Sequence, residues 1–148
     1  MIIVAQRCSK AQVLINNKTI SQIDSGLMLL VGINKGDELL DADKAVDKIV
    51  NLRIFNDEKN KMNLSVLDTR GSIMVVSQFT LCGDIKKGRR PSFINAESPD
   101  KGLLIYEYMV NRLRDKGINT VTGEFGAMMD IELVNEGPVT FVIDSKEL

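Results

Sequence analysis

Two segments with helical periodicity interrupt a series of apolar segments of strand length, and this order limits the fold more than any other feature. In residues 41–53 the apolar side chains recur at helical spacing, which predicts an amphipathic helix with one buried face. A second helix is predicted to begin at Ser98-Pro99-Asp100, because serine caps, proline suits the first position and aspartate complements the helix dipole. Gly117 is the expected end of that helix.

The remaining apolar segments are short and bounded by polar or glycine residues, as strands are. They are residues 2–8, 11–16, 19–23, 27–33, 72–79, about 118–122, 128–134 and 139–144, with loops at 56–63 and 82–98. We see no internal repeat and no linker. The order predicts a single α/β domain over residues 1–148, with a curved, barrel-like β-sheet and the two main helices packed outside it.

The chain contains no histidine, which excludes several kinds of chemistry. Ser-His-Asp and Cys-His catalysis both need an imidazole, and histidine is also the commonest metal ligand. The chain's two cysteines, Cys8 and Cys82, lack metal-motif spacing. We therefore expect no metal and no cofactor, and any hydrolysis must use another proton carrier.

Charge and cysteine usage limit the partners and the compartment. The net charge of −1 argues against sequence-indifferent binding along DNA or RNA, so a partner RNA must be gripped locally. No stretch approaches the roughly 20 apolar residues that cross a bilayer, so no membrane partner is expected. Two cysteines are too few for a disulfide framework, which indicates reduced thiols in a cytoplasmic protein.

Two polar segments are candidate sites, and each also has a purely structural interpretation. Ser77-Gln78-Phe79-Thr80 follows an apolar strand, where polar groups either form a site or cap the strand end. Asn135-Glu136-Gly137-Pro138-Val139-Thr140 separates two predicted strands, where Gly-Pro usually makes a turn. Glycine also lets backbone approach a ligand closely, and proline tolerates a preceding cis peptide.

Taken together, the two segments resemble the signature motifs of the D-aminoacyl-tRNA deacylase family. Ser-Gln-Phe-Thr-Leu lies near mid-chain, and Asn-x-Gly-Pro-Val-Thr follows about sixty residues later. The resemblance covers essentially the whole chain and extends to Arg7, residues 61–63, 88–93 and 126–128. It implies an enzyme that hydrolyses the ester of D-aminoacyl-tRNA, with the acceptor end of tRNA as its partner.

The resemblance also implies a homodimer in which both chains build each site. Catalytic Ser77, Gln78, Phe79 and Thr80 are expected to line the pocket, and Gly137-Pro138 of the partner subunit, joined by a cis bond, to reach into it. The backbone oxygens of that segment would meet the side chain of an L-amino acid but only a hydrogen of a D-amino acid. Selection by steric exclusion makes glycyl-tRNA a further plausible substrate.

Two mechanisms stay open. A nucleophilic Ser77 or Thr80 needs a base, and the sequence offers none beside them. The alternative is assistance by the ribose 2′-hydroxyl of the tRNA, with donors such as the Phe79 N–H placed at the developing oxyanion. A non-catalytic dimeric RNA-binding domain is the rival interpretation of the whole chain.

Several further residues are expected to contact tRNA or substrate. The basic residues of the loop are either phosphate ligands or a solvated surface, Arg7 is either an ion-pair partner or a site residue, and Met128 belongs to a stretch that resembles the family. The basic residues are Lys86, Lys87, Arg89 and Arg90.

Overall fold

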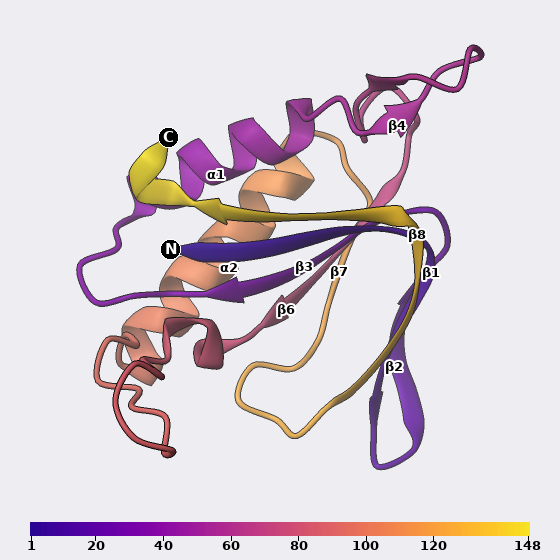
Figure 1. The fold of residues 1–148 in the computed structure, drawn as a ribbon. Coiled ribbons are helices and arrows are strands. Elements are labelled where there is room, and N and C mark those ends of the chain that lie inside the picture. Colours follow the sequence, from indigo (N-terminus) through magenta and orange to yellow (C-terminus); the bar gives the residue numbers. More distant parts are fainter.

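A six-stranded sheet forms the body of the computed structural model, which describes residues 1–148. Strands β3, β6 and β7 are parallel to one another, and the other pairs are antiparallel. Figure 1 shows β1 and β8 running side by side and bending together. The sheet order is β2 (Lys18–Ile23), β1 (Ile2–Ile15), β3 (Gly26–Gly32), β6 (Ser72–Ser77) and β7 (Thr120–Thr122), with β8 (Asp130–Asp144) also paired to β1.

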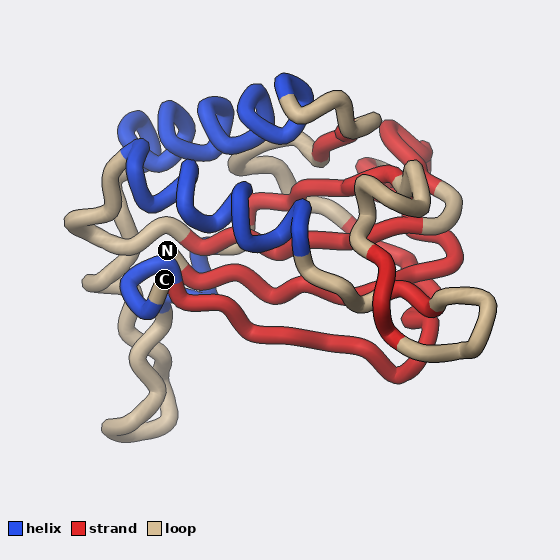
Figure 2. Tube along the Cα trace, turned by 90° about the horizontal axis from the view of Figure 1, so that it is seen from above, coloured by secondary structure: helices blue, strands red, loops and turns tan.

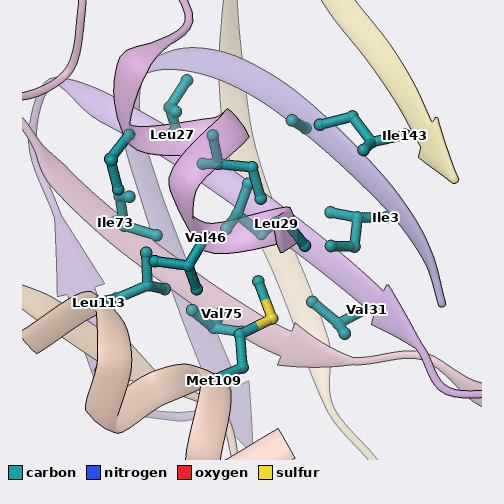
Figure 3. Close-up of a cluster of buried hydrophobic side chains, with 14 of the residues drawn as sticks. Ile3, Leu27, Leu29, Val31, Val46, Ile73, Val75, Met109, Leu113 and Ile143 are labelled. Carbon is teal, nitrogen blue, oxygen red and sulfur yellow. The ribbon is translucent and has the colours of Figure 1, made fainter. Parts of the chain in front are cut away.

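Two helices, α1 (Leu39–Asn51) and α2 (Pro99–Asp115), cover one face of this sheet (Figure 2). Their buried faces meet the inward side chains of the central strands in a large hydrophobic core. Neither helix is long and apolar enough to cross a membrane. Figure 3 shows part of this core, which includes Ile3, Leu27, Leu29, Val31, Val46, Ile73, Val75, Met109, Leu113 and Ile143.

A second, smaller core fills the inside of the curled sheet. The side chains that alternate with those of the first core point into it, so Met28 and Met74 are as buried as Leu29 and Val75. Strands buried on both faces are apolar throughout rather than alternating. This explains the uninterrupted runs at 27–31 and 73–76 and confirms the predicted α/β domain with a barrel-like sheet.

At each end of the chain, two strands were predicted where the structure has one long strand, so the prediction of a break was wrong. The predicted strands 2–8 and 11–16 form one strand, β1, which ends at Ile15, and the predicted strands 128–134 and 139–144 form one strand, β8, which begins at Asp130. The β1–β8 register shifts on either side of Cys8, where an irregularity interrupts the alternation of buried and exposed residues. A bulge of this kind bends a strand without ending it.

The helix boundaries follow the predicted signals with small shifts. Helix α1 begins at Leu39, two residues before the expected start, and the Asp41 carboxylate accepts from the Glu38 N–H at 2.9 Å. Ser98 precedes α2 but its hydroxyl makes no capping bond, contrary to expectation. Gly117, at φ +79°, ends that helix as predicted.

Three shorter elements differ from expectation. Strand β6 ends at Ser77 instead of residue 79, and a 3-10 helix, η1 (Phe79–Cys82), follows it. The predicted loop at 56–63 is largely a small hairpin of β4 (Phe55–Asn56) and β5 (Met62–Leu64), closed by the Asp57 carboxylate, which accepts from two backbone N–H groups. A last 3-10 helix, η2 (Ser145–Glu147), follows β8.

Candidate functional site

The Ser77–Thr80 segment forms a tight turn where β6 leaves the sheet. The Gln78 N–H donates to the Val31 carbonyl at 2.8 Å, which extends the β3 pairing by one bond before η1 begins. Gly32 permits this turn, because a Cβ there would lie 2.9 Å from the Gln78 oxygen and 2.8 Å from the Leu81 Cβ. The turn thus rests directly on the backbone of β3.

The side chains of this turn face solvent. Phe79 is 58% exposed and Thr80 is also exposed, whereas Ser77 and Gln78 are half-buried. The Gln78 Nε2 donates to the Thr80 Oγ1 at 2.6 Å. The group that contacts the Thr80 hydroxyl is therefore an amide, which cannot accept its proton as a base.

The thiol that ends this turn is not a candidate nucleophile. Cys82 is buried, and burial raises the pKa of its thiol, with a smaller opposing effect from the N-terminal ammonium. Burial likewise raises the pKa of the Cys8 thiol to about 11, and the negative charge of Glu136 adds to the increase. Since the thiolate is the reactive form, both thiols are inert near neutral pH.

The predicted basic loop forms an arm, residues 83–93, that begins at this turn. Asp84 and Ser92 exchange two backbone hydrogen bonds, of 2.8 and 2.9 Å, and the tip between them is solvent-exposed. In Figures 1 and 2 the segment after η1 extends away from the sheet. The exposed tip includes Lys86, Lys87, Arg89 and Arg90, none of which pairs with a carboxylate in the chain.

The Gly137-Pro138 segment lies within β8 and does not form a turn between strands. Its peptide bond is cis, and both residues are exposed. The Asn135 Nδ2 donates to the Val139 carbonyl at 3.0 Å and to the Arg7 carbonyl at 2.9 Å, so one side chain spans the segment and ties it to β1. No role of its own was predicted for Asn135, although it opens the motif.

Arg7 bonds to the backbone of the Gly137-Pro138 segment at Glu136. The residue is only 5% exposed, its Nη1 donates to the Ile54 carbonyl at 2.6 Å, and its Nε donates to the Glu136 carbonyl at 3.1 Å. The Nε also lies 3.8 Å from the Glu136 carboxylate. Of the two roles left open by the sequence, these contacts favour a structural partner that fixes the backbone just before Gly137.

In one chain the two predicted site segments lie apart. Ser77 is level with Val31 and Ile3 across the sheet, whereas Gly137 is level with Arg7. The offset along the strands is about 13 Å, and the two intervening strands add about 14 Å across the sheet. The two segments therefore do not line one pocket within a single chain.

Met128, two surface hollows and the possible metal ligands also bear on the predicted site. Met128 is 91% exposed, in the connection between β7 and β8. Two surface hollows, of about 370 and 520 Å³, contain none of the predicted site residues. No group of three or more histidine, cysteine, aspartate or glutamate residues is arranged to hold a metal ion.

A curved α/β domain that carries a polar turn at the end of a parallel strand and a cis Gly-Pro within an edge strand defines a recognisable class. A family model described as D-Tyr-tRNA(Tyr) deacylase matches residues 4–144. The chain belongs to this family.

Relatives of the chain share its full length. It is 55% identical over 147 residues to a D-aminoacyl-tRNA deacylase of Geobacillus sp., covering 99% of this chain and 97% of that one. It is 53% identical over 147 residues to the D-aminoacyl-tRNA deacylase of Bacillus velezensis, covering 99% of this chain and all (100%) of that one.

Two solved structures share the fold. One is a c-Myc DNA unwinding element binding protein, 35% identical, with a TM-score of 0.92 over 97% of this chain and 98% of that one. The other is a probable eukaryotic D-amino acid tRNA deacylase, with a TM-score of 0.82 over 96% of this chain and 97% of that one. At 18% identity the second supports the fold alone.

Proposed function

We propose that the chain hydrolyses the ester bond of D-aminoacyl-tRNA, consuming one water and releasing the free amino acid and the tRNA. The observation that carries this proposal is the Ser77–Thr80 turn, with Phe79 and Thr80 exposed, in a chain of this family. Its close relatives bear the name of this activity. Aminoacyl esters are labile, so a site that positions the ester can supply most of what hydrolysis needs.

The tRNA supplies the group that assists the reaction. The Gln78 amide holds the Thr80 hydroxyl, and the chain has no histidine to activate it. The ribose 2′-hydroxyl lies next to the ester carbonyl in every substrate. Water attack assisted by that hydroxyl leaves Phe79 to donate its backbone N–H to the oxyanion.

The active unit is a homodimer in which each site uses both chains. The separation of the two segments in one chain supports this arrangement, because only another copy can bring Gly137-Pro138 to the turn. Strand β8 pairs on one side only, so its other edge offers unpaired backbone groups. Exposed Phe141 and Val142 on the same strand give that edge apolar surface to bury.

Chirality is selected by the backbone of the partner subunit's Gly137 and Pro138. Their carbonyl groups occupy the space into which an L side chain would project, and a D-amino acid places only hydrogen there. Glycine has no side chain to exclude, so glycyl-tRNA on a non-cognate tRNA is also a substrate. Arg7 and Asn135 hold this backbone in place through the contacts described above.

The acceptor end of the tRNA binds beside the turn. Lys86, Lys87, Arg89 and Arg90 take its phosphates, which provides local positive charge on a chain whose net charge is −1. The exposed Met128 adds an adaptable apolar contact to the substrate. A protein that edits aminoacyl-tRNA works in the cytoplasm, where the free thiols of Cys8 and Cys82 remain reduced.

Incubation with D-tyrosyl-tRNA tests the proposal directly. Release of free tyrosine above the buffer background supports a deacylase. Tight binding without turnover supports the rival, a non-catalytic RNA-binding domain. Single-stranded DNA of equal length serves as the control for binding by charge alone.

A further inference from the structure

The arm of residues 83–93 leaves the body of the protein at Gly83 and returns to it at Phe93. Every residue from Asp84 to Asn95 is exposed, which leaves the cationic tip without packing of its own. At the root, Gly83 donates its N–H to the Thr80 carbonyl at 3.0 Å. The arm therefore starts from the same turn that carries the proposed catalytic residues.

Phe93, at the far end of the arm, returns to this turn. Its ring packs edge-on against that of Phe79, with the ring centroids 5.0 Å apart and an angle of 68° between the planes. A Cβ at Gly83 would lie 2.9 Å from the Phe93 ring and 2.9 Å from the Thr80 carbonyl oxygen. Bare backbone at Gly83 is thus what allows the Phe93 ring to reach the turn.

The segment after Phe93 is bonded to the residues that follow β3, so the ring lies between the exposed tip and an anchored segment. Lys35 donates its N–H to the Asn95 carbonyl at 2.8 Å, and Glu97 donates to the Ile33 carbonyl at 2.9 Å. A ligand that holds the tip therefore also restrains Phe93, and the contact between the two rings extends this restraint to Phe79.

We propose that Phe93 is a positioning residue that couples RNA binding on the arm to the placement of Phe79 in the turn. Phosphates bound at the tip hold the arm, the arm holds the Phe93 ring against Phe79, and the Phe79 backbone is fixed for the ester. The inference rests on the proposed function and adds to it a reason why the RNA body affects the chemical step. An ester without phosphates gains nothing from the arm.

The test compares D-tyrosyl-tRNA with D-tyrosyl-adenosine, which carries the same ester but no phosphate. Phe93→Ala is expected to lower kcat on the tRNA about tenfold, in the range of one aromatic pair, and to leave kcat on the short ester within about twofold. Phe93→Tyr keeps the ring and should retain the unmodified rate. Ile94→Ala, an exposed neighbour with no aromatic contact to the turn, is the matched control.

Further variants separate coupling from simple support. Once the four cations of the tip are replaced by alanine, Phe93→Ala should cause no additional loss of kcat on the tRNA. Equal losses on both esters, or no loss on either, would overturn the coupling while the deacylase activity stands. If the unaltered protein cleaves neither ester, the proposed function itself fails.

Discussion

At the scale of single residues, the proposed site contains hydroxyl groups but lacks the base that would make one a nucleophile. The Thr80 hydroxyl accepts a hydrogen bond from an amide, and burial raises the pKa of the nearby Cys82 thiol. In the proposed mechanism such a hydroxyl positions the substrate and does not attack it. The size of the loss on removing it distinguishes the two roles.

Thr80→Ala and Ser77→Ala are expected to keep measurable activity. Losing one positioning hydrogen bond costs about 10- to 100-fold, whereas loss of a true nucleophile costs on the order of 10⁶ in turnover. A substrate that ends in 2′-deoxyadenosine should be nearly inert. Single-turnover rates at saturating enzyme separate chemistry from binding, and a trapped acyl-threonine would contradict the RNA-assisted mechanism.

Selection by the Gly137-Pro138 backbone predicts the order of substrates. L-tyrosyl-tRNA should survive at enzyme concentrations that clear both D-tyrosyl-tRNA and glycyl-tRNA, because only the L side chain meets the excluding backbone. The rates of the three esters, measured on the same tRNA, check this order. Comparable hydrolysis of the L and D esters rules out exclusion by the backbone.

At the scale of elements, the sequence predicts what local pattern determines and misses what distant contacts determine. The two helices, the apolar central strands and the Gly117 stop are visible as periodicity or as a residue with a special backbone. The continuity of β1 is not visible, because the irregularity at Cys8 looks like a break in the alternation, and that of β8 is not, because Gly137-Pro138 looks like a turn.

In the candidate site, too, local motifs were predicted and contacts between distant residues were not. The polar turn and the Gly-Pro segment were found from their motifs, and the basic arm from its charges. The support from Arg7 to the Ile54 carbonyl and the span made by Asn135 join residues far apart in the chain. No local signal marks such contacts, since the first joins β1 to the residue before β4 and the second depends on the register of β8 against β1.

The start of α1 is joined to the C-terminal η2 by an ion pair with a defined pH dependence. The Asp41 carboxylate is 2.7 Å from the Lys146 Nζ and accepts from the Ser145 hydroxyl at 3.1 Å. Burial alone would raise the pKa of Asp41, but these bonds and the Glu38 N–H outweigh it and lower the pKa from 3.8 to about 2.

Asp41→Asn should therefore reduce the loss of unfolding free energy that the unmodified protein shows as the pH falls from about 4 to 2. Because the folded pKa lies below the unfolded one, the carboxylate stabilises the fold above about pH 4 and loses that effect as the pH falls toward 2. The contribution is about 2 kcal/mol in the free energy of unfolding near neutral pH. Urea unfolding between pH 7 and pH 2 measures it, with exposed Asp24→Asn as the control.

At the scale of the whole molecule, the proposed site consists of two segments that lie far apart in one chain, the turn at the end of β6 and the Gly-Pro segment within β8. In the proposed homodimer, two-fold symmetry would place the turn of each chain against the Gly-Pro segment of the other, so the composite site would occur twice. An inactivating change in the turn and one in the Gly-Pro segment then damage different parts of the same composite site. Two inactive variants can accordingly restore each other.

We predict this complementation for Thr80→Trp, which fills the pocket from the turn, and Pro138→Trp, which fills it from the other chain. In a mixed dimer both lesions fall in one site and the other site is intact. Random exchange makes half of the dimers mixed, so the mixture should recover about one quarter of the unmodified activity. The assay is D-tyrosyl-tRNA hydrolysis before and after subunit exchange in mild urea.

The matched control combines Thr80→Trp with Ser77→Trp, two lesions on the same side of the site. Every mixed dimer then carries one lesion in each site, so exchange should restore nothing. Light scattering should show a dimer at micromolar concentration for all three variants. Full activity from a chain that scatters as a monomer would exclude the shared site, because no single chain brings Thr80 and Pro138 together.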